Sequence, residues 1–251
     1  MFTPRDREKC EQLFEKYYAG RKFYDGVYRD TIRKHLRPGQ RLLDAGCGRY
    51  LRVSREFAGV AGQVVGIDLE STLETGNRNA PFGVRGDLNH LPFPSEYFDM
   101  VISRSVVEHL EDPVQVFREF CRVLRPSGKV VIVTPNKYDY VSLIAAVTPY
   151  WFHRALVSRI FQVAEHDVFP TLYRANTISS IQNALRSAGL VEKELGTITH
   201  YPAYLMFSPV LFRVGVLYER LTSLKPFQSL RASILCVFEK QGTGGRLAEA
   251  S

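Results

Sequence analysis

The chain has 251 residues with a formal net charge of +7, a length that suits one α/β domain with added helices. Its four cysteines form no C-x-x-C pair, and its charged first ten residues lack the apolar run of a signal peptide. We therefore expect a cytoplasmic protein of a reducing compartment, with neither a zinc site nor a disulfide framework. The basic residues form no dense block or recognition motif, so no nucleic-acid partner is predicted.

Residues 1–37 are predicted to form an N-terminal helical cap. Apolar and charged positions alternate at helical spacing through 5–36, and Gly20 and Gly26 are expected to interrupt the pattern. Much of the apolar surface is aromatic. Whether these rings line a ligand site or only pack on the core is left open by the sequence.

Residues 41–68 hold two apolar strands, with a glycine turn after the first and an acid near the end of each. Leu42 and Leu43 suit a buried parallel strand, which Asp44 and a turn on Gly46 and Gly48 follow. Asp68 comes at the carboxyl end of the second strand, where open α/β sheets bind ligands. A carboxylate there can accept both hydroxyls of a ribose, so this segment predicts a nucleotide-type cofactor site.

The glycine spacing separates two cofactor classes. The dinucleotide fingerprint G-x-G-x-x-G, counted from Gly46, would require a third glycine where the chain has Leu51. A pyrophosphate would then lack the close helix packing that glycine permits. NAD and an oxidoreductase function are therefore disfavoured.

With Asp44 before its glycines, the turn resembles motif I of class I S-adenosylmethionine-dependent methyltransferases, D/E-x-G-x-G-x-G, with Tyr50 in place of the last glycine. The resemblance covers residues 38–135, including VRGD, LPFPSEYFDMVISRSVVEHLEDP and CRVLRPSGKVVIVTPN. It points to small-molecule members of the type 11, quinone-biosynthesis-like group. It implies a Rossmann-like fold: a seven-stranded, mostly parallel sheet with an antiparallel last strand, helices on both faces, and helical inserts after strands five and six.

The same resemblance implies a set of donor-binding residues for S-adenosylmethionine. Asp87 would bond the adenine amino group and the Leu88 N–H would meet the ring, while the strand from Phe98 to Ser103 would end at the reactive end of the cofactor. The full set is Asp44, Gly46, Cys47, Gly48, Asp68, Leu69, Asp87, Leu88 and Ser103.

The later elements are expected to complete one domain over residues 1–240, with a cofactor-binding core at 38–135. Asp112 and Pro113 should start a helix that runs to Leu124, and Asn176 and Thr177 a second one that Gly189 ends. Two more strands are predicted at 191–195 and 233–238. The tail, 241–251, is expected to be disordered.

Two inserts, 136–175 and 199–229, carry apolar stretches at 141–163 and 201–221. Prolines and arginines interrupt both, so neither suits a transmembrane span of about 20 apolar residues. They could pack on the core or lie in a membrane interface. Peripheral contact with the inner face of a membrane is therefore one predicted possibility.

The catalytic base has two candidates, His109 after the fourth strand and His166 between Glu165 and Asp167. Some relatives bind a metal through E-x-x-E-H at this place, but Ser105 replaces the first carboxylate here. No essential metal is predicted.

The expected function is transfer of a methyl group from S-adenosylmethionine to a small, apolar or lipid-linked acceptor, at oxygen. The alternative is a non-catalytic methyltransferase-like module that binds the cofactor or a partner.

Overall fold

The computed structural model describes residues 4–48, 51, 53–69, 82–147 and 170–242. The candidate base His166, Tyr50 and the tail from 243 onward lie outside these ranges. The chain divides into two compact units: a sheet unit of 28–134, 172–196 and 235–251, and a helical unit of 1–27, 135–171 and 197–234. The prediction of one domain over 1–240 stays a prediction.

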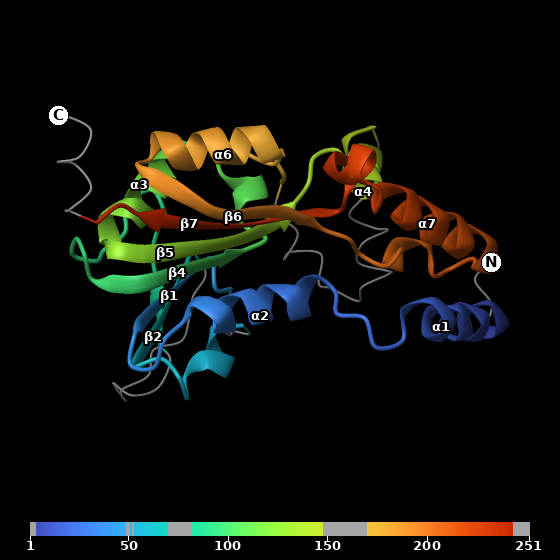
Figure 1. Ribbon diagram of the computed structural model, residues 1–251, viewed down its shortest axis with the longest axis horizontal. Coiled ribbons are helices and arrows are strands. Elements are labelled where there is room, and N and C mark those ends of the chain that lie inside the picture. The colour runs from blue at the N-terminus through green and yellow to red at the C-terminus, as the bar shows by residue number, and fades with distance from the viewer. Residues whose placement is uncertain (1–3, 49–50, 52, 70–81, 148–169, 243–251) are drawn as a thin grey trace. The chain divides into compact units, whose positions relative to one another are not determined.

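A seven-stranded sheet in the order β3-β2-β1-β4-β5-β7-β6 forms the centre of the fold (Figure 1). The strands are β1 (Arg41–Ala45), β2 (Gln63–Asp68), β3 (Phe82–Arg85), β4 (Phe98–Arg104), β5 (Leu124–Pro135), β6 (Leu190–Ile198) and β7 (Ser233–Lys240). Strands β1 to β5 pair in parallel, and the last strand runs antiparallel. This confirms the predicted Rossmann-like class.

The middle strands are apolar on both faces because helices cover the sheet from both sides. Leu43 of β1 pairs with Val65 of β2 and with Val101 of β4, and all three side chains are buried. Helices α3 (Pro113–Val123) and α6 (Ile178–Ser187) lie on one face, and α2 (Tyr24–His35) lies on the other (Figure 1).

The predicted starts of α3 and α6 are confirmed. The Asp112 carboxylate accepts from the Gln115 N–H, and Pro113 takes the first turn, where its missing N–H has no cost. Thr177 and Ser180 form a capping box at α6, and Gly189, with φ of 87°, follows its end.

One expectation needs correction. Gly26 lies inside α2, so only the break around Gly20, where φ is 72°, separates α2 from α1 (Pro4–Tyr18). Strand β7 lies between β5 and β6, which makes β6 the edge strand. The described part of the segment after the glycine turn forms only a short 3-10 helix, η1 (Ser54–Phe57), while η2 (Val107–His109) follows β4.

In the helical unit, α1 packs against α7 (Pro209–Thr222) through a cluster of aromatic and aliphatic side chains (Figure 1). Tyr18 and Phe212 meet edge to face with ring centroids 6.2 Å apart, and Arg21 forms an ion pair with the buried Glu219 at 2.8 Å. The unit also contains α4 (Tyr140–Val147), η4 (Ala203–Leu205) and η5 (Lys225–Leu230). Over the described ranges, no helix is both long and apolar enough to cross a bilayer.

Candidate functional site

The turn after β1 is tied to the end of β2 by main-chain hydrogen bonds. The N–H groups of Gly46 and Cys47 donate to the Ile67 carbonyl oxygen at 2.8 and 3.2 Å. The Gly48 N–H donates to Oδ2 of Asp68 at 2.9 Å. The predicted turn and the predicted acid therefore form one connected structure at the carboxyl edge of the sheet.

The two glycines of the turn have different reasons to be glycine. Gly46 has φ of 79°, and a Cβ at this position would lie 2.1 Å from Cγ2 of Val106. Gly48 has φ of 62°, but a Cβ there would lie within 4 Å of nothing among the described residues. Gly46 therefore permits a close approach within the protein, whereas Gly48 makes no such contact with the described residues.

Asp44, at the end of β1, is a buried carboxyl. Burial raises its pKa to about 6, while the polar groups of Ser54 and the Arg104 guanidinium partly offset this rise. The charge of Asp68 adds to the rise. A cationic ligand group near them would lower the pKa of Asp44 and relieve the cost of its burial.

The remaining predicted donor residues lie at the ends of β2, β3 and β4. Leu69 follows Asp68 and is 61% exposed. Asp87, beyond β3, accepts from the N–H and the side-chain amide of Asn89, both at 2.9 Å, with half-buried Leu88 between them. Ser103 is buried within β4, and its hydroxyl has no hydrogen-bond partner in the described part of the chain.

Asn176, Thr134 and Glu108 form a buried series of hydrogen-bonded side chains, and the sequence did not predict it. The Asn176 side-chain amide donates to Oγ1 of Thr134 at 2.7 Å, and that hydroxyl donates to Oε2 of Glu108 at 2.9 Å. Burial raises the pKa of Glu108, while the His109 and Arg104 charges lower it. The signal available in the sequence was an acid at position 108 directly after two valines.

Hydrogen bonds to the Glu108 main chain hold the segment that carries His109. The Glu108 carbonyl oxygen accepts from the N–H groups of Leu172 and Tyr173 at 2.7 and 3.1 Å. Nε2 of His109 lies 3.9 Å from Oε1 of Glu108, and the His109 side chain is 30% exposed. His109 is thus partly accessible beside a buried carboxyl, and its role as a base remains a prediction.

Within the described ranges, no group of three or more His, Cys, Asp and Glu residues could hold a metal ion. Glu108 and His109 are neighbours but lack a third ligand there.

An open, mostly parallel sheet with a glycine turn and acids at its carboxyl edge is the fold of class I methyltransferases. A solved S-adenosylmethionine-dependent methyltransferase of Mesorhizobium loti superposes on the chain with a TM-score of 0.56. The superposition covers 86% of this chain and 99% of the solved protein, and the two sequences are 18% identical. Residues 43–132 match the family described as methyltransferase domain. Residues 43–132 therefore form a methyltransferase domain, and the chain has the fold of class I S-adenosylmethionine-dependent methyltransferases, as the sequence resemblance implied.

Curated relatives share part of this chain. The ubiquinone/menaquinone biosynthesis C-methyltransferase of Edwardsiella ictaluri is 30% identical over 154 residues, which are 57% of this chain and 61% of that protein. A protein of Mycolicibacterium smegmatis named as a probable S-adenosylmethionine-dependent methyltransferase is 37% identical over 109 residues, 42% of each chain. The chain thus spans about half the length of these relatives.

Gly46→Ala should destabilise the sheet unit, because its Cβ would overlap Val106 and a side chain disfavours the positive φ. We expect a loss of about 2 to 4 kcal/mol in the free energy of unfolding, measured by urea denaturation. Gly48→Ala, whose Cβ would contact none of the described residues, should lose only about 1 kcal/mol. Adding Val106→Ala should recover part of the free energy of unfolding that Gly46→Ala loses, because it removes the overlapping side chain. Equal losses for the two glycines would contradict this account of the turn.

Asp44→Asn should change how stability depends on pH. Asp44 has a pKa of about 6 in the folded chain against an ordinary 3.8, so its ionisation removes stability as the pH rises from about 4 through 6. Between pH 4 and pH 7, the Asn variant should gain on the order of 3 kcal/mol over the native chain, measured without donor.

Asp139→Asn is a matched control in the helical unit. Burial also raises the pKa of Asp139 to about 6, and its carboxylate accepts from the Val141 N–H at 3.1 Å, a cap that Asn can keep. Between pH 4 and pH 7, Asp139→Asn should show a similar gain in the free energy of unfolding. It should leave the affinity for S-adenosylmethionine unchanged. A pH-independent difference for Asp44→Asn would contradict the assignment of a buried, raised-pKa carboxyl.

Proposed function

We propose that this chain transfers a methyl group from S-adenosylmethionine to a small, apolar or lipid-linked acceptor, at oxygen. The observation that carries the proposal is the joint placement of Gly48 and Asp68. At the first, a Cβ would contact none of the described residues, and the second holds a carboxylate 2.9 Å from the Gly48 N–H. Small backbone, turn N–H groups and an acid at a strand end are what a nucleoside ligand requires.

The residues divide the donor between them. Asp68 would accept the ribose hydroxyls, since a carboxylate has acceptor positions beyond the one that Gly48 uses. Exposed Leu69 offers apolar surface to an adenine ring, while Asp87 and the Leu88 N–H would meet its polar edge. Asp44 and the glycine turn would hold the amino-acid part, whose ammonium group would favour the ionised carboxylate.

When bound, S-adenosylmethionine supplies a positively charged sulfonium whose methyl group is the transferred one. The protein's part is therefore largely to position the acceptor and, where the acceptor is protonated, to remove its proton. His109 is the described candidate for that proton because it is partly accessible at the end of η2. Glu108, fixed by Thr134 and Asn176, would orient the segment that carries it.

The acceptor class has two supports. Large apolar side chains are exposed on the helical unit, including Leu143, Phe207 and Val210. The Edwardsiella ictaluri relative is named for ubiquinone and menaquinone biosynthesis, which are apolar products. Because that relative is named a C-methyltransferase, transfer to carbon is the second candidate, and an assay should score both products.

Donor binding is expected to depend on Asp68. S-Adenosylmethionine or S-adenosylhomocysteine at a hundred times its dissociation constant should stabilise the chain by about 2.7 kcal/mol, measured as a rise in the unfolding midpoint, whereas NAD should have no effect. Asp68→Ala should lose this response, while Glu111→Ala, which removes an exposed acid of the same unit, should keep it. A response that survives Asp68→Ala, or one produced by NAD, would overturn the donor assignment.

His109→Asn is expected to reduce turnover about 100-fold at saturating donor if His109 removes a proton, with donor affinity unchanged. The matched control is His90→Asn, an exposed histidine of the same unit, which should keep full turnover. Undiminished turnover of His109→Asn would clear His109 of that role.

Intact donor binding without transfer to any phenol, quinol or lipid-linked acceptor would favour the non-catalytic alternative.

A further inference from the structure

Helix α7 is apolar on its outward face. Val210, Val214, Leu217 and Leu221 recur at steps of four, three and four residues, which places them along one side of a helix. They are 66%, 57%, 58% and 48% exposed. Surface helices ordinarily turn polar residues outward, so this face calls for a partner.

The opposite side of α7 is already used. Phe212 and Val216 are buried in the cluster that joins α7 to α1, and Glu219 is buried in its ion pair with Arg21. Burial within the helical unit therefore does not account for the outward residues. Phe207 before the helix and Leu224 after it, 42% and 54% exposed, continue the same spacing. We refer to Phe207, Val210, Val214, Leu217, Leu221 and Leu224 as the α7 stripe.

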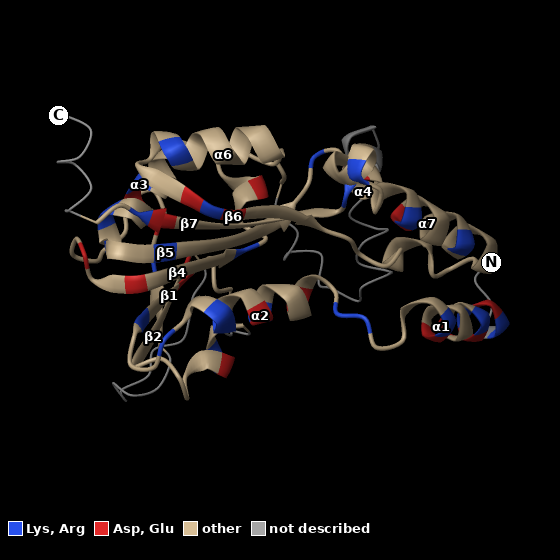
Figure 2. Ribbon diagram, viewed as in Figure 1, with Lys and Arg blue, Asp and Glu red and all other residues tan. Residues whose placement is uncertain are grey.

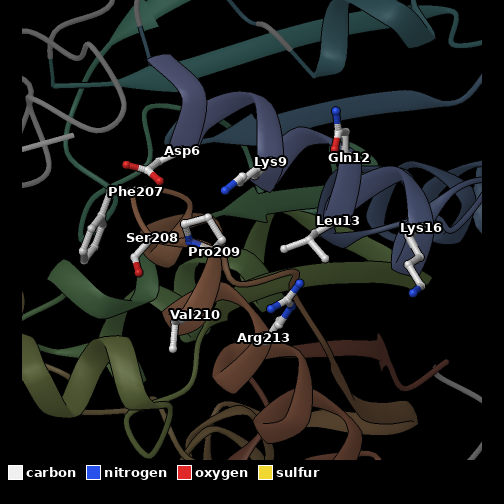
Figure 3. A pocket seen from close by; sticks show the side chains of 10 residues that line it. All are labelled: Asp6, Lys9, Gln12, Leu13, Lys16, Phe207, Ser208, Pro209, Val210 and Arg213. Carbon is white, nitrogen blue, oxygen red and sulfur yellow. The ribbon is translucent and has the colours of Figure 1, made fainter. Parts of the chain in front are cut away.

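Cations from two helices lie along one edge of the α7 stripe. Lys9 and Lys16 of α1 and Arg213 of α7 line a pocket of about 860 Å³ together with Phe207 and Val210 of the stripe (Figure 3). Asp6 is the carboxylate that also lines this pocket. Figure 2 shows Lys and Arg residues on both α1 and α7, with Asp and Glu residues on each helix as well.

Three cations and one carboxylate line this edge, which leaves it with a net positive charge. Among the described residues, no carboxylate forms an ion pair with Lys9, Lys16 or Arg213, and the exposed Arg220 guanidinium stacks over the Tyr17 ring at 5.2 Å. Three of the four acidic residues of α1 line a different pocket. They are Glu8, Glu11 and Glu15. The apolar face is thus bordered by three cations and by one carboxylate, that of Asp6.

We propose that the α7 stripe docks on an anionic phospholipid bilayer, with Lys9, Lys16 and Arg213 at the level of the headgroup phosphates. An apolar helical face bordered by cations is the pattern of helices that lie in a membrane interface, where each Lys or Arg near an anionic surface adds to the affinity. A second copy of the chain is the weaker occupant, because it would bring the same cations with no exposed carboxylate on α7 to pair with them. This surface goes beyond the proposed methyl transfer and would serve it by bringing the chain to apolar acceptors.

The test is flotation of the full chain with vesicles of phosphatidylcholine alone and of an equal mixture of phosphatidylcholine and phosphatidylglycerol, without donor or acceptor. The chain should float with the mixed vesicles and bind neutral ones much more weakly. Lys9→Gln, Lys16→Gln and Arg213→Gln should each weaken binding to mixed vesicles about fivefold and reduce its sensitivity to salt.

The apolar arm uses Val214→Gln with Leu217→Gln, which should weaken binding more than about tenfold on both vesicle types. Val60→Gln with Val191→Gln, at exposed positions of the sheet unit, is the matched control and should bind as the native chain does. Circular dichroism would verify that each variant is folded. Because vesicle binding is measured without donor, and donor binding without vesicles, failure of either proposal is distinguishable from failure of the other.

Absence of native-chain binding to mixed vesicles would overturn the proposal. So would a concentration-dependent dimer, seen by sedimentation equilibrium, that the stripe substitutions dissociate, since the stripe would then be covered by a second copy. Equal binding by the stripe variant and the native chain would likewise overturn it.

Discussion

The cofactor edge of this protein depends on the hydrogen bonds that tie the turn after β1 to the end of β2. Gly46 and Cys47 donate to Ile67, and Gly48 donates to Asp68, so the turn and the acid cannot move independently. The turn can lie this close because Gly46 has no side chain against Val106. The parallel register of β1 with β2 and β4 brings the other polar groups to the same edge. The chemistry that we propose follows from this one arrangement, since every donor-binding role is assigned relative to it.

The site also contains buried acids whose electrostatic cost a cationic ligand would reduce. Asp44 has a raised pKa because it is buried, and burial likewise raises that of Glu108. Arg104 acts on both, which places a cation and two acids in one neighbourhood of the sheet unit. Burying a carboxylate destabilises the folded chain unless a partner charge or ligand compensates it. The buried acids therefore favour a binding site over a purely structural core.

Elements with strong local signals were predictable from the sequence. Asp112 with Pro113, and Thr177 with Gly189, mark helix ends by side-chain caps and a positive φ, which depend on neighbouring residues alone. The place of β7 between β5 and β6 depends on contacts between distant segments, and no local pattern encodes it. The link from Asn176 to Thr134 and Glu108 joins residues far apart in the chain for the same reason. The predicted helix break at Gly26 was wrong because packing of α2 overrides the low helix propensity of one glycine.

The central claim is that the donor lies against the glycine turn and the end of β2. The most direct measurement is the change in backbone amide chemical shifts of the full chain on addition of S-adenosylhomocysteine. The account predicts the largest changes at Gly46, Gly48, Leu69 and Leu88, with the Gly48 amide strongly affected because it already bonds Asp68. Saturable changes confined to other segments, or no changes at millimolar ligand, would contradict it.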